Sequence, residues 1–196
     1  MRCSRAACVA VYTALVLSVL VSAAAAAERR TVVDSAGRRV EVPVKIDRVF
    51  VAGGPASVFI YTLAPDKLLG WNRPLTPEER AYIPPRYAKL PTLGRLTGRG
   101  NTANVEVMLA ARPDVIIDYG SVNPTYVSLA DRVQQQTGVP YLLFDGSLSQ
   151  IPRAYAAAGE ALGVGERAKE LARYAEGLLN EIDERLARVP IEQSAL

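Results

Sequence analysis

Apolar segments with strand character alternate with segments of helical periodicity along most of this chain, and this alternation constrains the fold more than any other feature. The strand-like segments are RVFVA at 48–52, DVIIDY at 114–119 and PYLLF at 140–144, and the segments of helical spacing are 56–64, 104–111, 123–137 and 150–162. Strands that alternate with helices form parallel sheets covered on both faces. The sequence therefore predicts an α/β fold with a mostly parallel sheet covered by helices.

The remaining segments of the first half predict shorter elements. TVVDSAGRRVEV at 31–42 is typical of two short strands around a Ser-Ala-Gly turn, and Pro43 ends the second strand. KLLGW at 67–71 predicts another short strand. The stretch 72–93 is rich in proline, so we expect a long ordered loop with one helical turn at 77–82.

The last segment predicts one long helix over 166–188. Its apolar stripe follows steps of three or four and consists of Leu171, Ala175, Leu178, Ile182 and Leu186. At 1.5 Å per residue such a helix is roughly 35 Å long. That is longer than a domain of this size needs, so one side of the helix is expected to have nothing to pack on.

Residues 1–27 have the three parts of an export signal. A basic start with Arg2 and Arg5 precedes an uncharged apolar run at 9–21, and small residues follow at 22–27. The alternative is a membrane anchor, because the uncharged stretch 9–27 approaches the roughly 20 residues that span a bilayer. We favour a cleaved signal, since the final Ser and Ala residues drive insertion weakly. With no cysteine after the apolar run, a lipoprotein is not expected, and the mature protein is predicted to be periplasmic.

Composition excludes several kinds of chemistry. The chain has no histidine, and its two cysteines, Cys3 and Cys8, fall within the predicted signal. Ser-His-Asp and Cys-His nucleophiles and Cys/His zinc sites therefore cannot be built, and we expect no cofactor. A net charge of +3 also disfavours nucleic acid as a partner.

Three loops are candidate ligand-binding segments, because ligands of α/β sheets sit beyond the carboxyl ends of the strands. The first holds Gly53, Gly54 and Pro55, where the backbone can turn sharply and approach a ligand. The second, GRLTGRGNTA at 94–103, combines glycines with Arg95, Thr97, Arg99 and Asn101, and guanidinium groups pair well with anionic oxygens. The third holds Tyr119, Gly120 and Ser121. The alternatives are an ordinary strand-to-helix turn and a solvated loop.

Aromatic and acidic residues at predicted strand ends add weaker candidates. Trp71 and Tyr119 could stack on a flat ligand, with Arg73 nearby, or they could cap the core. Asp114 and Asp145 are typical of turns. Asp118 lies inside an apolar strand and is either a strand-end ligand group or a cap.

The order of these segments resembles a known family. The matching pieces are TVVDSAGRRVEVP at 31–43, DRVFVAGGPASVFIYTLAPDKLLGW at 47–71 and LPTLGRLTGRGNTANVEVMLAARPDVIIDYG at 90–120, followed by the long helix. Together they resemble the substrate-binding proteins of bacterial ABC importers for iron-siderophores, haem and cobalamin, in which one long helix joins two lobes. The segment NVEVMLAARPDVII at 104–117 is the most specific part of the match.

The resemblance implies an organisation. It divides the chain into a signal peptide at 1–27, an N-terminal α/β ligand-binding lobe at 28–164, a long linking helix at 165–189 and the start of a second lobe or a tail at 190–196. It also implies a ligand cleft between two lobes, and it gives Glu106 the role of docking on an arginine of the membrane permease. Because family members continue into a second lobe, we expect this chain to be a fragment of a longer protein.

The resemblance implies a solute-binding component of an ABC importer and not an enzyme. It would capture a metal chelate, with a ferric siderophore preferred, and deliver it to the inner-membrane permease. Haem, cobalamin, nickel-chelate and molybdate-type ligands stay open within the family. Alternatives of other classes are an exported hydrolase that uses carboxylates such as Asp118 and Asp145, and an association module that uses the long-helix stripe.

Overall fold

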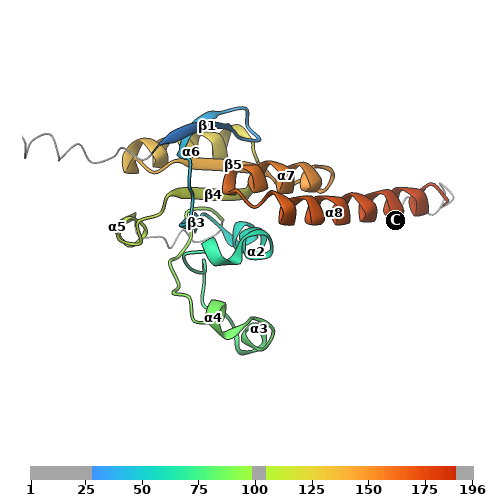
Figure 1. The fold of residues 1–196 in the computed structure, drawn as a ribbon, viewed down its shortest axis with the longest axis horizontal. Helices are drawn as coiled ribbons and strands as arrows, with labels where there is room; N and C mark the ends of the chain where they lie inside the picture. The colour runs from blue at the N-terminus through green and yellow to red at the C-terminus, as the bar shows by residue number, and fades with distance from the viewer. Residues whose placement is uncertain (1–27, 99–104, 189–196) are drawn as a thin grey trace, which may run out of the picture.

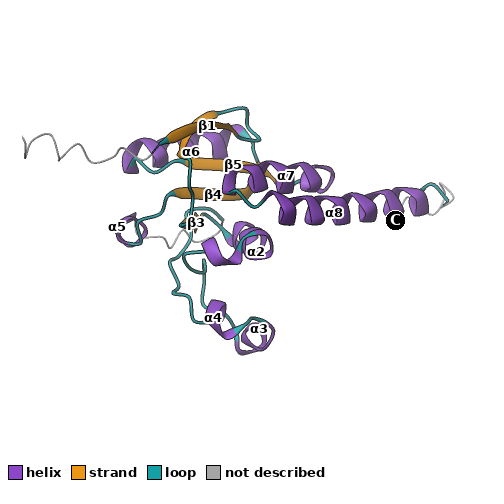
Figure 2. Ribbon diagram, in the orientation of Figure 1, coloured by secondary structure: helices purple, strands orange, loops and turns teal. Residues whose placement is uncertain are grey.

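The core of the molecule is a three-stranded parallel sheet. The computed structural model describes residues 28–98 and 105–188. Its sheet has the order β3-β4-β5 and consists of β3 (Val49–Val51), β4 (Val115–Gly120) and β5 (Tyr141–Asp145). Both strand pairs are parallel, so the connections cross over through helices. The predicted α/β fold is confirmed (Figure 1 and Figure 2).

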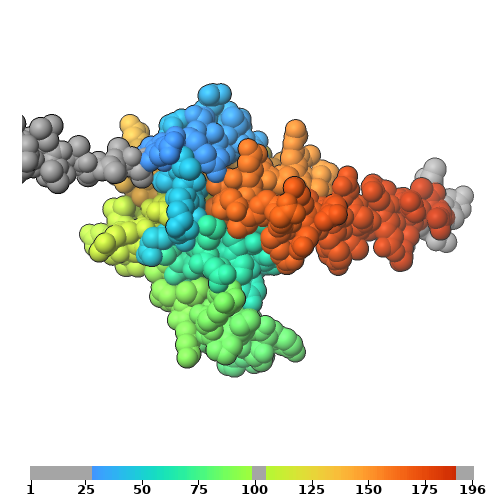
Figure 3. Space-filling view, viewed as in Figure 1, coloured from blue at the N-terminus to red at the C-terminus, as the bar shows by residue number. Residues whose placement is uncertain are grey.

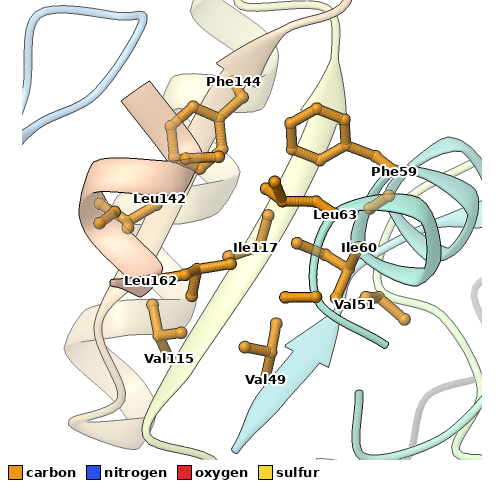
Figure 4. Packing of buried hydrophobic residues seen from close by; sticks show 14 of the residues in the cluster. Val49, Val51, Phe59, Ile60, Leu63, Val115, Ile117, Leu142, Phe144 and Leu162 are labelled. Atoms are coloured by element: carbon orange, nitrogen blue, oxygen red, sulfur yellow. The ribbon is translucent and has the colours of Figure 1, made fainter. Parts of the chain in front are cut away.

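Helices cover both faces of this sheet. On one face, α2 (Gly54–Leu63) and α7 (Ile151–Leu162) pack against side chains such as Val51, Ile117 and Phe144, as Figure 4 shows. On the other face, α6 (Pro124–Thr137) and α5 (Val105–Ala110) contribute to a second cluster of buried residues. Successive strand residues point to opposite faces, so the parts of the strands that helices cover on both faces are apolar. This explains why the segments VFV (49–51) and VII (115–117) contain no polar residue.

Helix α6 shows how local sequence sets its own bounds. Asn123 caps its start, with the side-chain oxygen accepting from the backbone N–H groups of Thr125 and Tyr126. Gly138 ends it in the left-handed conformation at φ 71°, which glycine adopts without strain. The helix predicted at 123–137 is therefore confirmed.

An antiparallel hairpin, β1 (Arg29–Val33) with β2 (Arg39–Pro43), is tied to the sheet by a buried carboxylate. Asp34 accepts hydrogen bonds from the backbone N–H groups of Ala36, Arg38 and Leu143, and it pairs with the Arg38 guanidinium at 3.1 Å. Since Leu143 belongs to β5, this one side chain joins the turn to the sheet. The predicted hairpin is confirmed.

The proline-rich segment contains more helix than the sequence predicted. It forms α3 (Pro77–Tyr82) and α4 (Pro85–Ala88), which lie beyond α2 from the sheet (Figure 1). The 3₁₀ turn η1 (Pro65–Lys67) precedes this segment. The helical turn at 77–82 is confirmed, with a Thr76–Glu79 capping box at its start. Helix α4 was missed because its two prolines favour a loop, although proline at the first helical position is favourable.

The strand predicted at 67–71 is wrong. The 3₁₀ turn η1 takes its first residue, and the rest forms single bridges, Leu68 with Val49 and Trp71 with Thr92. Gly70 packs so closely on the next segment that a Cβ there would lie 2.5 Å from the Pro91 carbonyl oxygen. The backbone at Gly70 therefore packs tightly against Pro91 and Leu93, and it does not continue as a strand of the sheet.

The long C-terminal helix is confirmed as α8 (Gly165–Leu186), a helix of 22 residues. Its first turns pack on α7, where Gly159 and Ala168 are in close contact. Farther along, Tyr174, Leu178 and Leu186 are exposed, and Figure 3 shows the helix extending beyond the body of the molecule. Within residues 28–98 and 105–188, no helix combines the length and apolarity needed to cross a membrane.

We predict opposite effects of alanine at two helical glycines. Gly159→Ala should lower the free energy of unfolding by about 1–3 kcal/mol, because its Cβ would overlap the Ala168 side chain across the α7–α8 contact. Gly177→Ala is the matched control: its Cβ meets open space, and it should raise stability by about 0.5–1 kcal/mol. Urea denaturation of both variants measures this, and equal effects would contradict the close helix contact.

Candidate functional site

The carboxyl ends of β3 and β4 meet in a hollow of about 320 Å³ at one edge of the sheet. Segments from all three predicted loops line it. The lining residues are Gly53, Gly54, Pro55, Arg95, Thr97, Gly98, Asp118, Tyr119, Gly120, Ser121 and Tyr126. The fold thus brings together the glycine turn, part of the arginine loop and the end of β4, which lie far apart in the sequence. We call this hollow the strand-end pocket.

The turn at Gly53 requires glycine because another segment packs directly on it. A Cβ at this position would lie 2.5 Å from the Thr97 hydroxyl oxygen. The backbone N–H groups of Leu96 and Thr97 both donate to the Ala52 carbonyl, at 2.7 and 3.0 Å, and hold the arginine loop against the end of β3. Gly53 then caps α2, whose first residues line the pocket.

Asp118 is a buried carboxyl group in the pocket lining, with 5% of its surface exposed. Oδ1 accepts from the Tyr119 backbone N–H at 3.0 Å and from the Thr97 hydroxyl at 3.4 Å, and Oδ2 accepts from the Tyr141 hydroxyl at 3.3 Å. Burial raises the pKa of Asp118, and these hydrogen bonds oppose the rise. Asp118 therefore both supports the loop through Thr97 and contributes to the pocket.

Two tyrosines form the aromatic part of the pocket. Tyr119 stacks on Phe59 at 4.2 Å with nearly parallel rings, so one of its faces belongs to the core. Burial raises the pKa of the Tyr119 hydroxyl. Tyr126, which the sequence analysis did not single out, comes from the first turn of α6. An aromatic residue in the first turn after a strand-end loop was the available signal.

Trp71 packs in the core and also lines a hollow next to α2, and its stacking on a ligand stays a prediction. It is 6% exposed, and its indole N–H donates to the Tyr87 carbonyl at 2.9 Å. Its ring contacts Tyr61 at a centroid distance of 5.4 Å. The core-capping alternative is the one that the structure supports, because aromatic neighbours and a hydrogen bond occupy the indole.

Arg73 is held by a carboxylate outside the strand-end pocket. Its guanidinium forms a bidentate pair with Glu79, at 2.8 and 2.5 Å. The guanidinium and the Thr76 backbone N–H lower the pKa of Glu79 to about 2. Arg73 therefore closes the turn before α3, and its charge is neutralised locally.

Two further hollows adjoin the strand-end pocket. One, of about 320 Å³, shares Gly54 and Pro55 with it and continues over Tyr61 and Leu75. The other, of about 460 Å³, shares Arg95 with the strand-end pocket. We refer to the three together as the groove. It extends from an apolar end between α2 and α3 to the polar strand-end pocket.

Several sequence candidates lie elsewhere. Arg99 and Asn101 fall outside the described residues. Glu106 is exposed in the first turn of α5. Asp114 accepts from the backbone N–H groups of Asp47 and Arg48, and Asp145 accepts from that of Ser147, so both are turn residues as expected.

The groove offers hydrogen-bonding and charged groups, and no metal cluster accompanies it in the described segments. Within residues 28–98 and 105–188, no group of three or more acidic, histidine or cysteine side chains is arranged to hold a metal ion. The arrangement suits noncovalent binding of a small molecule against a glycine turn, an arginine and a buried carboxyl group.

We predict that Asp118→Asn changes the pH dependence of stability. The folded-state pKa of Asp118 lies above its ordinary value of 3.8, so the wild type loses stability as pH rises through these two values. The asparagine variant lacks this loss, and at neutral pH its free energy of unfolding should match or exceed that of the wild type by up to about 1 kcal/mol. Urea denaturation from about pH 4 to pH 7 tests this. A variant clearly less stable at neutral pH would show that the charged hydrogen bonds outweigh burial.

Comparisons with known proteins give matches among solved structures. No family model matches the chain, and no curated protein sequence matches it significantly. An ABC transporter solute-binding protein from Sulfurospirillum deleyianum superimposes with a TM-score of 0.70 at 29% identity, over 82% of this chain and 50% of the other. The TroA-like periplasmic binding protein FepB from Veillonella parvula gives 0.62 at 25% identity, over 81% of this chain and 50% of the other.

A third match shows the fold alone. The molybdate-binding protein MolA of a Haemophilus influenzae ABC transporter, solved with molybdate bound, has a TM-score of 0.61 at 18% identity, over 83% of this chain and 55% of the other. In each case the chain spans about half the length of the solved protein. The resemblance stated from the sequence is thus confirmed: the chain has the fold of the N-terminal lobe, with its following long helix, of an ABC transporter solute-binding protein of the TroA-like type.

Proposed function

We propose that this chain forms one side of the solute-binding cleft of an ABC importer and binds a metal chelate there, with a ferric siderophore preferred. The observation that carries the proposal is the groove, in which the glycine turn, Arg95 and the end of β4 converge although the sequence separates them. Fold neighbours that are solute-binding proteins of ABC transporters support it.

The chemistry of the groove supports a ligand with anionic or strongly polarised oxygens. Arg95 lines both the strand-end pocket and the adjoining hollow, where a guanidinium can form two parallel hydrogen bonds to oxygens. From the sequence, we propose that Arg99 of the same loop also pairs with anionic groups of the ligand. The backbone at Gly53 and Gly54 permits close approach of the ligand.

The extent of the groove favours a chelate over a bare oxyanion. MolA, which shares the fold, binds molybdate. Here three hollows adjoin through shared residues, and one of them has the apolar lining of Val58, Tyr61 and Leu75. A small tetrahedral ion uses neither this length nor the apolar end. Haem, cobalamin and nickel chelates, like a siderophore, are larger than such an ion. They are the alternatives that the titration below separates.

Export to the periplasm is part of this proposal. It rests on the signal-like residues 1–27, which lie outside the described residues, and on the periplasmic binding proteins among the fold neighbours. The second side of the cleft is proposed to come from a second lobe, since the chain spans about half of each solved relative. The long-helix association module remains an alternative, because Leu178, Ile182 and Leu186 are exposed on α8.

We predict that arginine replacement in the loop weakens capture. Arg95→Ala and Arg99→Ala should each reduce the affinity for an anionic chelate by about 1.5–3 kcal/mol, through loss of a charged hydrogen bond. Arg39→Ala, on the exposed side of β2, is the control and should leave affinity unchanged. Titration calorimetry with ferric siderophores, haem, cobalamin, nickel chelates and molybdate measures this. Unchanged affinity for every ligand that binds would remove these arginines from the site.

We also propose that Glu106 docks the chain on a permease arginine. Glu106 is exposed near the start of α5, beside the exposed Val105 and Val107. Glu106→Gln should reduce solute-dependent stimulation of permease ATPase activity at least about tenfold, with unchanged solute affinity, since it removes an interfacial charge pair. The permease encoded beside this protein, reconstituted in liposomes, provides the assay. Glu176→Gln on α8 is the control, and equal effects of the two variants would refute the docking role.

A further inference from the structure

A buried carboxyl group and an arginine line the same pocket. Asp118 is 5% exposed at the end of β4, and it lines the strand-end pocket together with Arg95. The described donors that contact its oxygens are the Tyr119 backbone N–H and the hydroxyl groups of Thr97 and Tyr141. All three donors are neutral, so within residues 28–98 and 105–188 no charged group is seen to bond to the Asp118 carboxyl group.

The carboxyl group also retains capacity for another donor. Two carboxylate oxygens offer about four acceptor positions, and the described donors occupy three of them. Oδ1 has two partners, whereas Oδ2 has the Tyr141 hydroxyl at 3.3 Å, a long hydrogen bond for two oxygen atoms. A buried acceptor gains most from a donor that arrives with a charge, because charge-assisted hydrogen bonds are the stronger kind.

The charged groups of the groove lie in different parts of it. The bidentate pair of Arg73 and Glu79 lines the hollow with the apolar end. Arg95 lines both the hollow of about 460 Å³ and the strand-end pocket, and Asp118 lines the strand-end pocket. A ligand in the strand-end pocket therefore meets both a guanidinium and a carboxyl group.

We propose that Asp118 is a specificity-determining residue that selects solutes carrying a hydrogen-bond donor, with a primary ammonium as the strongest form, next to the oxygens that face Arg95. This inference rests on the proposed function, because it names the chelate class that the same groove takes. The donor bonds to Asp118 within the strand-end pocket, and the chelate oxygens lie against Arg95. A bare oxyanion brings negative oxygens to a carboxyl group and is disfavoured.

A purely structural role for Asp118 makes a different prediction. The carboxyl group links the arginine loop through Thr97 to the core through Tyr141, so a structural Asp118 would affect stability and lower the affinity for every ligand alike. A specificity role changes the ratio of two affinities measured on the same protein. The test therefore compares two ligands that differ in one donor group.

The experiment titrates the full chain with two ferric trihydroxamate chelates, ferrioxamine B and its N-acetylated form, which lacks the free ammonium group. We expect the wild type to bind the ammonium form about tenfold more tightly, as a charged hydrogen bond implies. Asp118→Asn should abolish this preference. Asp145→Asn is the matched control: it removes a strand-end carboxylate that lines a different hollow, and it should keep the preference.

The outcomes separate this inference from the proposed function. If the wild type binds both chelates equally, the donor inference is overturned and chelate capture stands. If sodium molybdate binds more tightly than either chelate, the selection against oxyanions is overturned. If neither chelate binds, the inference is overturned, and the proposed function fails as well where none of the siderophores, haem, cobalamin or nickel chelates titrated above binds. The comparison of two chelates on the wild type needs no variant, so it decides the matter even where Asp118→Asn does not fold.

Discussion

Parallel pairing of three short strands is the constraint on which the rest of this structure depends. β4 pairs with β3 through Val51 and Ile117 and with β5 through Gly120 and Asp145, so the carboxyl ends of all three strands lie at one edge. The crossover helices that parallel pairing demands cover both faces, so the strands are apolar except at their carboxyl ends. Polar groups at and beyond these ends, Asp118 among them, are thereby concentrated at a single edge, where the strand-end pocket forms.

Close backbone packing converts this edge into a site. Leu96 and Thr97 both donate to the Ala52 carbonyl, and Thr97 lies where a Cβ of Gly53 would be. The same threonine donates to Asp118, so one loop brings a cation and a buried carboxyl group to the same pocket. The groove thus acquires charges of both signs from segments that are about twenty residues or more apart.

Much of this could be predicted from local sequence, and what failed or stayed open at 67–71 has one physical cause. The hairpin, α6 and α8 carry their own turn, cap and periodicity signals, and all were confirmed. The strand predicted at 67–71 was wrong and the core position of Trp71 was left open, because both depended on what packs beside them. Thr92 and Tyr87 supply that packing, and neither is a local neighbour.

Local sequence was enough to predict the alternation of strands and helices, the glycine turn at Gly53 and the resemblance to ABC importer binding proteins, because these depend on periodicity and on residues close together in the chain. Which charged groups share the groove became clear from the folded chain alone. It paired Arg73 with Glu79 and placed Asp118 in the same pocket as Arg95. Burial and charge pairing are properties of neighbours in space, and no local pattern specifies them.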